Sequence, residues 1–347
     1  MTVKWYVRPV AANGAWPEAI GFGFAEMTTS ATGDAPLLVI VTPVYNGARF
    51  LAETMDSVQA QTYSNLVHIV LDNASTDGTA DILKRYANAR IPVSVHRNDT
   101  TVPMAANWNK ALTFIPPEAK YFRVLCADDV ITPDFSTRMI ALAERNPSVV
   151  VVGCDLQHHR GEGTFDQKWD TDRDIFPGRE AVGRFFENRG MIIAHQTIFR
   201  SSVLGTRHPF LEADMAANDT DAVLDLLRNG DWGFVHERLA TTREHPDSDT
   251  STFVKPLKMD LCEHLALLER HAEYGLGKVA GRRMTRTYRR YYLRLLMRWR
   301  VRGEGDRVQR HIAALRGFKV GLSPLSFLDA IVDWPLARLG LRPVWKG

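Results

Sequence analysis

The chain has 347 residues, 45% hydrophobic and 24% charged, which excludes a disordered or fibrous protein and predicts one large or two ordinary globular domains. Its net charge of +3 is unevenly placed, since residues 278–302 hold ten Lys or Arg and no acid, while the rest holds 33 basic and 40 acidic side chains. The three cysteines (Cys126, Cys154 and Cys262) are too widely spaced for a disulfide framework, and no run of about 18 apolar residues predicts a membrane-spanning helix.

Residues 1–35 predict a poorly ordered lead, because Gly, Ala, Pro and Thr are frequent there and apolar residues recur with no period. This segment lacks the basic and then apolar pattern of an export signal, so we expect a cytoplasmic protein. Met27 lies shortly before the first clear strand and is an alternative natural start.

The next part of the chain predicts alternating strands and helices. Apolar runs at 37–45, 65–73 and 121–129 predict buried strands, and 92–98 predicts a weaker one. Helical spacing of apolar residues occupies the segments between them. This order predicts an α/β fold with a mainly parallel sheet flanked by helices.

Polar residues follow each predicted strand of this region. Because ligands bind at the carboxyl ends of parallel strands, we expect one crevice to hold them. The residues are Thr42, Tyr45, Asp72, Asn98, Asp128 and Asp129.

The second half of the chain has a weaker pattern. Extended segments are predicted at 148–157, 194–200 and 231–245, with a polar loop over 157–175. Residues 218–230 predict an amphipathic helix that opens on acids and closes at a glycine.

Four spaced motifs lie between about residues 36 and 250: "VIVTPVYNGARFLAETMDSVQAQTY", "IVLDNASTDGT", "CADD" and "ANDTDAVLDLLRNGDWGFV". Together they resemble the family 2 glycosyltransferases, whose GT-A fold is a Rossmann-like, mixed but mainly parallel sheet flanked by helices. The resemblance implies an inverting enzyme that moves a sugar from a nucleotide-diphosphate sugar to a hydroxyl of a glycan or polyprenol-linked acceptor. It also implies a place in cell-surface polysaccharide synthesis.

The first two motifs match the family's nucleotide-binding strand ends. By this resemblance Thr42, Pro43 and Tyr45 hold the base and ribose, and Asp72 accepts a hydrogen bond from the base edge. Asn73 stands where the family has a second acid.

The third motif matches the family's D-x-D signature, with Cys126 in place of the first acid. The resemblance makes Asp128 the ligand of a divalent ion, Mn²⁺ or Mg²⁺, which favours carboxylate and phosphate oxygens. Asp129 and Arg243 are then expected to contact the donor, and His245 to complete the metal shell.

The fourth motif matches the segment that carries the family's catalytic base. Asp219 takes that position, with Asp221 as the alternative, while a charged first helical turn is the purely structural interpretation. In another segment, Asn107 matches an asparagine that contacts the donor.

Residues 251–347 predict a basic, amphipathic, helical C-terminal region. Aromatic and aliphatic residues alternate there with arginines at helical spacing, namely Tyr288, Tyr291, Tyr292, Leu295 and Trp299. This pattern predicts peripheral contact with the inner face of the plasma membrane. Packing on the catalytic domain is the alternative, and nucleic acid is not expected as a partner.

Two other functions compete with the transferase. A non-catalytic relative that only binds nucleotide sugar or glycan would account for Cys126 and Asn73. A dinucleotide-dependent oxidoreductase is disfavoured, because no G-x-G-x-x-G follows the first strand.

Overall fold

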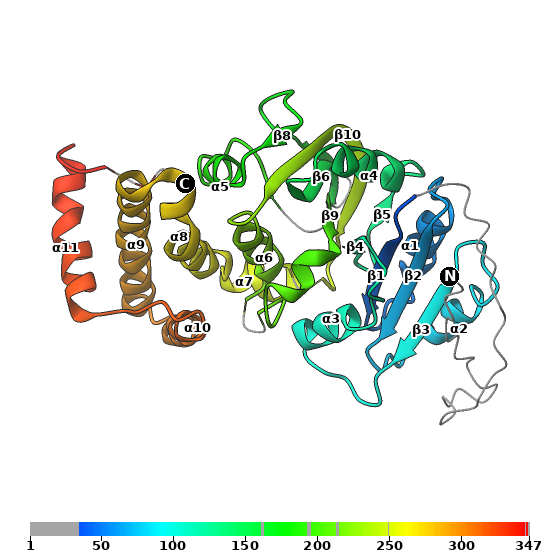
Figure 1. The fold of residues 1–347 in the computed structure, drawn as a ribbon. Coiled ribbons are helices and arrows are strands. Elements are labelled where there is room, and N and C mark those ends of the chain that lie inside the picture. The colour runs from blue at the N-terminus through cyan, green and yellow to red at the C-terminus, as the bar shows by residue number, and fades with distance from the viewer. Residues whose placement is uncertain are drawn as a thin grey trace.

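The fold was analysed in a computed structural model, which describes residues 35–160, 163–192, 196–212, 215–248, 250–343 and 345. Figure 1 shows a large twisted sheet with helices on its faces and a stack of C-terminal helices beside it. Met27 and all but the last residue of the predicted lead lie outside the described residues.

The first half of the sheet is parallel, as predicted. Its strand order is β3-β2-β1-β4, and β1 pairs in parallel with both β2 and β4. Every residue of β1 and β2 is buried, because helices cover both faces of these strands. The elements are β1 (Leu38–Val44), α1 (Leu51–Gln59), β2 (Leu66–Asp72), α2 (Thr79–Lys84), β3 (Val93–Arg97), α3 (Met104–Leu112) and β4 (Tyr121–Val124).

The second half makes the sheet mixed. Strand β9 pairs antiparallel with β4 and with β6, and the long β10 lies parallel to β6. The elements are β5 (Val130–Ile131), α4 (Phe135–Arg145), β6 (Val149–Arg160), β7 (Gly163–Gln167), β8 (Ile175–Phe176), α5 (Gly178–Phe186), β9 (Thr197–Arg200), α6 (Asn218–Leu226) and β10 (Asp231–Glu244).

The prediction of a polar loop over 157–175 is wrong in its first part and holds for residues 168–174. Strand β6 continues through it to Arg160, and β7 pairs back on β6 in antiparallel fashion. Strand β5 and helix α5 were not predicted.

Strand β5 positions the end of the chain's last strand. It pairs antiparallel with β10, with Ile131 opposite Ala240 and Val130 opposite Thr241. Because β5 directly follows the CADD motif, this pairing brings the residues after Thr241 to the same end of the sheet as that motif.

Beyond β10 the described chain is helical. A π-helix (Thr250–Val254) leads into α7 (Lys255–Leu257), α8 (Asp260–Leu276), α9 (Lys278–Val301), α10 (Gly305–Gly317) and α11 (Pro324–Arg338). Helix α8 packs on α5, α9 on α8, and α11 on α9, so α11 is the outermost element in Figure 1. Within the described ranges, no helix is long and apolar enough to cross a bilayer.

Small residues allow the close contact between α5 and α8. A Cβ on Gly275 would come 2.7 Å from the backbone nitrogen of Gly183, a distance that real side chains do not adopt. The two helices therefore depend on glycine at their crossing point.

One hydrophobic core joins the sheet to the C-terminal helices. A single cluster of buried side chains includes Phe122 and Phe199 of the sheet, and Tyr292 and Leu296 of α9. The strands end at Glu244, yet the core continues past that point. The domain boundary near residue 250 therefore stays a prediction.

The prediction that the aromatic residues of α9 face a membrane is wrong for three of them. Tyr288, Tyr292 and Trp299 are buried in this core, because α8 and α10 cover that side of α9. These three residues pack within the protein, as the alternative interpretation predicted.

Candidate active site

The CADD motif forms a compact group of metal-binding atoms at the carboxyl end of β4. Single ligand atoms of Cys126, Asp128 and Asp129 all lie within 4.8 Å of one another. Asp129 is buried, whereas Asp128 and Cys126 are partly exposed. The turn therefore gathers one sulfur and two carboxylates at the place where the sequence predicted a metal site.

The end of β10 completes this group. His245 Nε2 lies 3.2 Å from Asp128 Oδ2, and the backbone N–H of Arg243 donates to Asp129 Oδ1 over 3.2 Å. The pairing of β5 with β10 produces both contacts, since it fixes the register of the two segments. The structure thus brings together four of the predicted site residues from positions more than 110 apart in the sequence.

Two buried nitrogen atoms of this group lack a hydrogen-bond partner among the described residues. They are Arg243 Nη1 and His245 Nδ1. Leaving a buried polar group unpaired costs about 1–3 kcal/mol, so a ligand that paired with these two atoms would gain that free energy.

Helix α1 and the residue before it supply two side chains that sequence analysis missed. Glu53 accepts a hydrogen bond from Arg243 Nη2 over 2.6 Å. The ring of Phe50 lies below the Arg243 guanidinium, 5.3 Å away, and 4.8 Å from the His245 ring. Both residues belong to the first motif, but nothing in their spacing indicates that they orient side chains from β10.

The donor chemistry fits a hard divalent cation. Asp128 and Asp129 offer oxygen atoms and His245 an imidazole nitrogen, all of which divalent ions such as Mn²⁺ accept. Cys126 is the one donor that Mn²⁺ and Mg²⁺ do not favour, because thiolate sulfur is soft. The two carboxylates and the imidazole therefore suit such an ion, whereas the thiol does not.

Tyr45 lies exposed at the carboxyl end of β1, with 54% of its surface accessible. The loop after it is held by three backbone N–H groups that donate to side chains of the loop after β2 and of the first residue of α2. Asn46 donates to Ser75 Oγ, Gly47 to Thr79 Oγ1 and Ala48 to Asp77 Oδ2, over 2.9–3.0 Å. This network fixes the backbone that presents the Tyr45 ring.

Asp77 has the structural role that its position suggests. Burial raises the pKa of its carboxyl, but the hydrogen bonds from Thr79 and Ala48 outweigh burial, so the pKa lies below its ordinary value. Its Oδ1 accepts from the backbone N–H of Thr79, the first residue of α2. Asp77 therefore joins two loops and the start of a helix.

The side chain of Thr42 is fully buried, and its expected contact with the base and ribose stays a prediction. Its Oγ1 lies 2.8 Å from Nε2 of His68, on the neighbouring strand β2. Burial lowers the pKa of His68 to about 3, so the imidazole is neutral near pH 7. The adjacent Pro43 is also buried.

Asp72 is fully buried and both of its oxygens have partners within the protein, so its expected hydrogen bond to the base edge stays a prediction. Oδ1 accepts from the backbone N–H of Ser75 over 2.9 Å, and Oδ2 forms an ion pair with Arg97 of β3. Arg97 also donates to the Ser75 carbonyl over 2.8 Å. The carboxylate thus holds Arg97, which is partly exposed and was not singled out from the sequence.

Asn107 belongs to a buried amide network, and its expected contact with the donor stays a prediction. Its Oδ1 accepts from Asn98 Nδ2 over 2.8 Å, and Asn98 also donates to Asn73 Oδ1. Asn73 Nδ2 in turn donates to the carbonyl of Val102 over 2.8 Å. A carboxylate cannot make that last bond, which gives a structural reason for asparagine at position 73.

The two candidate bases on α6, Asp219 and Asp221, have different surroundings. Asp221 is 1% exposed and contacts Arg207, Arg270 Nη1 at 3.0 Å and His271 Nε2 at 2.9 Å. Burial opposes its charge, but these three partners outweigh burial and hold the pKa of Asp221 well below its usual range. Asp219 lies two residues earlier, is partly exposed, and accepts from the backbone N–H of Thr220 over 2.6 Å. Asp221 therefore stabilises the fold through its three partners. Asp219 is the better placed of the two to act as a base, because it is partly exposed.

A buried glutamate of α8 lies beside the start of α6. Glu263 Oε1 accepts from the backbone N–H of Ala216 over 2.7 Å. Burial raises the pKa of Glu263 to about 7, and the charge of Asp219 adds to that effect. Sequence analysis missed this residue, because an isolated glutamate within an amphipathic helix carries no signal.

Comparison with known proteins gives the family context. Residues 39–207 match the sequence model described as "Glycosyl transferase family 2". The chain is 28% identical over 218 residues to EpsE of Bacillus subtilis, provisionally assigned as a glycosyltransferase, covering 61% of this chain and 75% of EpsE. It is 33% identical over 127 residues to TuaG of the same organism, provisionally assigned as a glycosyltransferase of teichuronic acid biosynthesis, covering 36% of this chain and 50% of TuaG.

Solved structures show the same fold at low identity. The 1–349 fragment of Staphylococcus aureus TarS in complex with UDP has a TM-score of 0.61 and 15% identity, covering 88% of this chain and 92% of that one. The mannosyltransferase PcManGT of Pyrobaculum calidifontis, in complex with GDP-Man and Mn²⁺, has a TM-score of 0.55 and 15% identity, covering 88% and 83%. These similarities confirm the predicted GT-A fold.

Proposed function

The chain belongs to glycosyltransferase family 2, and we propose that it transfers a sugar from a nucleotide-diphosphate sugar to a hydroxyl of a glycan or polyprenol-linked acceptor, with inversion. The observation that carries this proposal is the convergence of Asp128 and Asp129 with Arg243 and His245 at one end of the sheet. The arrangement offers both carboxylates for a cation and cationic N–H groups for phosphate.

The donor would lie across the carboxyl ends of β1 and β4. Tyr45 offers an exposed ring for stacking on the nucleotide base. The unpaired Nη1 of Arg243 offers a charged donor to a diphosphate oxygen, beside the carboxylate of Asp129. Thr42, Asp72 and Asn107 would act indirectly, by holding His68, Arg97 and Asn98.

Asp128 and His245, with Asp129 next to them, would hold Mn²⁺ or Mg²⁺. When bound, such an ion neutralises the charge that develops on the leaving diphosphate. Arg243 adds a fixed positive charge on the same side, while Glu53 and Phe50 keep its guanidinium in place.

Asp219 would take the proton from the acceptor hydroxyl as that oxygen attacks the anomeric carbon. Inversion requires a base on the face opposite the leaving group, and general base catalysis of this kind contributes about 10²–10⁴-fold in rate. Its location on the first turn of α6, which Glu263 and His271 hold from α8, supports this role.

The relatives support a role in cell-surface polysaccharide synthesis and suggest which donors to test. TuaG is assigned to teichuronic acid biosynthesis, TarS structures contain UDP or UDP-GlcNAc, and the PcManGT structure contains GDP-Man. We therefore propose uridine and guanosine diphosphate sugars as the first candidates.

The test is donor binding by calorimetry over a panel of UDP, GDP and dTDP sugars, with and without Mn²⁺. One donor should bind in a Mn²⁺-dependent way, and Asp128→Ala should abolish that dependence. Asp81→Ala, which removes an exposed acid of α2, is the matched control and should bind as the unaltered protein does. Binding that ignores both Mn²⁺ and Asp128 would overturn the proposed site.

A further inference from the structure

The last described helix, α11, and the residues that follow it expose several large apolar side chains. Large hydrophobic residues that are at least 50% exposed gather between positions 325 and 341, and we call them the α11 surface: Leu325, Leu328, Ile331, Val332, Trp334, Leu339 and Leu341. Leu325, Leu328 and Val332 recur at steps of three and four, which places them on one side of the helix. Other exposed hydrophobic residues in the described ranges are scattered over the chain, so this surface is the one concentration of them.

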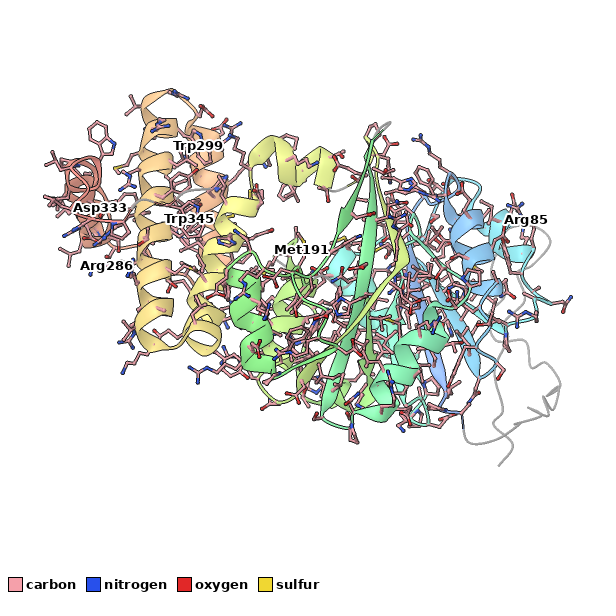
Figure 2. All side chains as sticks on the ribbon, turned by 90° about the horizontal axis from the view of Figure 1, so that it is seen from above. Arg85, Met191, Arg286, Trp299, Asp333 and Trp345 are labelled. Atoms are coloured by element: carbon pink, nitrogen blue, oxygen red, sulfur yellow. The ribbon has the colours of Figure 1, made fainter. Side chains whose placement is uncertain are left out.

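The opposite side of α11 is fixed against α9 by ion pairs. Asp333 is buried and lies 2.9 Å from Arg290 Nη1 and 2.6 Å from Arg294 Nη1. Asp329 pairs with Arg290 Nε over 2.8 Å and with Arg286 over 3.3 Å. Figure 2 shows Asp333 on the side of α11 that faces α9. These contacts hold the helix in one orientation, with its apolar residues facing outward.

The charge around α11 is positive. From residue 307 to the end, the chain has seven Lys or Arg and two acids, and two of these cations are paired, Arg307 with Glu304 and Arg342 with Asp333. Those acids are Asp329 and Asp333, and both pair with arginines of α9. Arg316 and Lys319 are exposed just before α11. An apolar surface with cations and without exposed acids is complementary to anionic lipid, whereas a second copy of this chain would bring like charges together.

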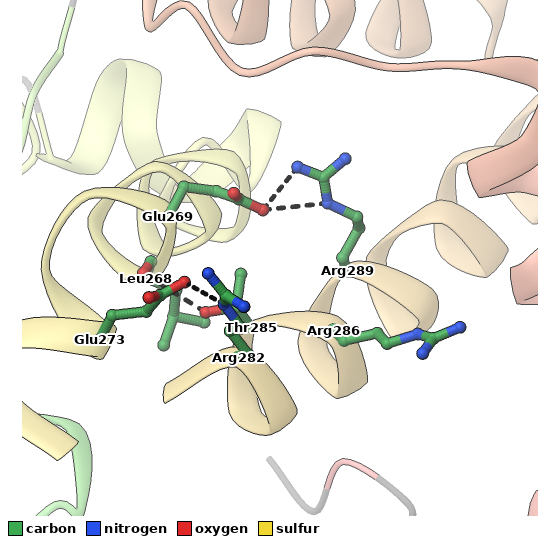
Figure 3. Close-up of a pocket in the computed structure, with 7 residues that line it drawn as sticks. All are labelled: Leu268, Glu269, Glu273, Arg282, Thr285, Arg286 and Arg289. Atoms are coloured by element: carbon green, nitrogen blue, oxygen red, sulfur yellow. Dashed lines mark hydrogen bonds and ion pairs between the residues drawn. The ribbon is translucent and has the colours of Figure 1, made fainter. Parts of the chain in front are cut away.

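Many arginines of α9, in contrast, are paired with acidic side chains of the neighbouring helices. Figure 3 shows the groove between α8 and α9, where Arg282 pairs with Glu273 over 2.7 Å and Arg289 with Glu269 over 3.0 Å. Arg286 of the same groove is engaged by Asp329. The basic run therefore largely holds the helical stack together rather than forming a free cationic surface.

We propose that the α11 surface binds the plane of an anionic membrane, with α11 parallel to the bilayer and its leucines in the boundary between headgroups and acyl chains. The proposal deepens the proposed function, because it places the enzyme where lipid-linked acceptors are found. It nevertheless has its own readout, since vesicle binding needs neither donor nor acceptor.

The test is flotation of the full chain with vesicles of phosphatidylcholine alone and with added phosphatidylglycerol. The protein should float with the anionic vesicles, less so at high salt, and Leu328→Glu/Val332→Glu should reduce the floating fraction at least tenfold. Val279→Glu/Val301→Glu is the matched control, because both valines are more than 80% exposed on α9. This control should float as the unaltered chain does.

Three outcomes would overturn the proposal: no flotation of the unaltered chain, equal flotation of Leu328→Glu/Val332→Glu, or equal loss in the control pair. A dimer that the α11 variant alone converts to a monomer, without flotation, would assign the surface to a second copy instead. Donor binding measured without vesicles separates this result from failure of the proposed function.

Discussion

His271 Nε2 of α8 lies 2.9 Å from Asp221 Oδ1 of α6, so the C-terminal helices hold the helix that carries the candidate base. Both residues are almost fully buried, and two arginines share the same carboxylate. Residues that hold the candidate active site in place therefore also lie outside residues 39–207, the part of the chain that matches the family model.

Replacing Asp221 by Asn should strongly destabilise the protein. Removing the charge leaves Arg207, Arg270 and His271 without their shared partner, and breaking a buried ion pair costs about 3–5 kcal/mol. Urea denaturation measures the loss. Asp225→Asn is the control, because Asp225 is partly exposed and should cost at most about 1 kcal/mol. Similar losses for the two variants would contradict the central role of Asp221.

Glu263 should make stability depend on pH. Burial raises its pKa to about 7 from 4.5, so the folded state binds the proton more tightly than the unfolded chain does. The contribution of this proton to the free energy of unfolding is therefore complete below pH 4.5. As pH rises through about 7 the free energy of unfolding falls, by on the order of 3 kcal/mol.

Glu263→Gln tests this directly. The variant should gain stability relative to the unaltered protein between pH 5 and pH 8, as measured by urea denaturation at each pH. Glu118→Gln, at an exposed position, should show no such trend. A constant difference between Glu263→Gln and the unaltered protein across this range would refute the expectation.

Asp219→Asn should lower kcat by about 10²–10⁴-fold while donor affinity and thermal stability remain as they are. The reason is that the amide keeps the shape of the side chain but cannot accept the acceptor's proton. Steady-state kinetics, together with calorimetric donor binding, separates the two effects. If kcat survives in Asp219→Asn, the base lies elsewhere.

Cys126→Asp should strengthen metal binding. A third carboxylate would join Asp128 and Asp129 within a group of atoms that already lie within 4.8 Å, and oxygen suits Mn²⁺ and Mg²⁺ better than sulfur does. The Mn²⁺ concentration needed for half-maximal donor binding should fall. Cys126→Ser, which adds no charge, should leave it higher than Cys126→Asp does, and an equal effect of both changes would count against a ligand at position 126.

The sequence predicted the parallel half of the sheet well, because fully buried strands are continuous apolar runs with polar ends. It also located the CADD turn, since Asp128 and Asp129 directly follow such a run. Strand β5 has two residues and no pattern of its own, so the pairing that brings Arg243 to Asp129 could not be derived from spacing.

The roles of the strand-end residues depend on partners in neighbouring strands. Thr42 and Asp72 look equally available in the sequence, but His68 and Arg97 engage them once the strands are in register. The aromatics of α9 present the same difficulty. Helical spacing shows that Tyr288 and Tyr292 share a face, but the neighbouring helices decide that this face is buried.

The succession of α5, α8, α9 and α11 also sets a length scale. Packed helices lie about 8–10 Å apart, so three successive contacts separate α5 from α11 by roughly 25–30 Å. An enzyme resting on lipid through α11 would carry α5, and with it that side of the sheet domain, at a comparable height above the bilayer.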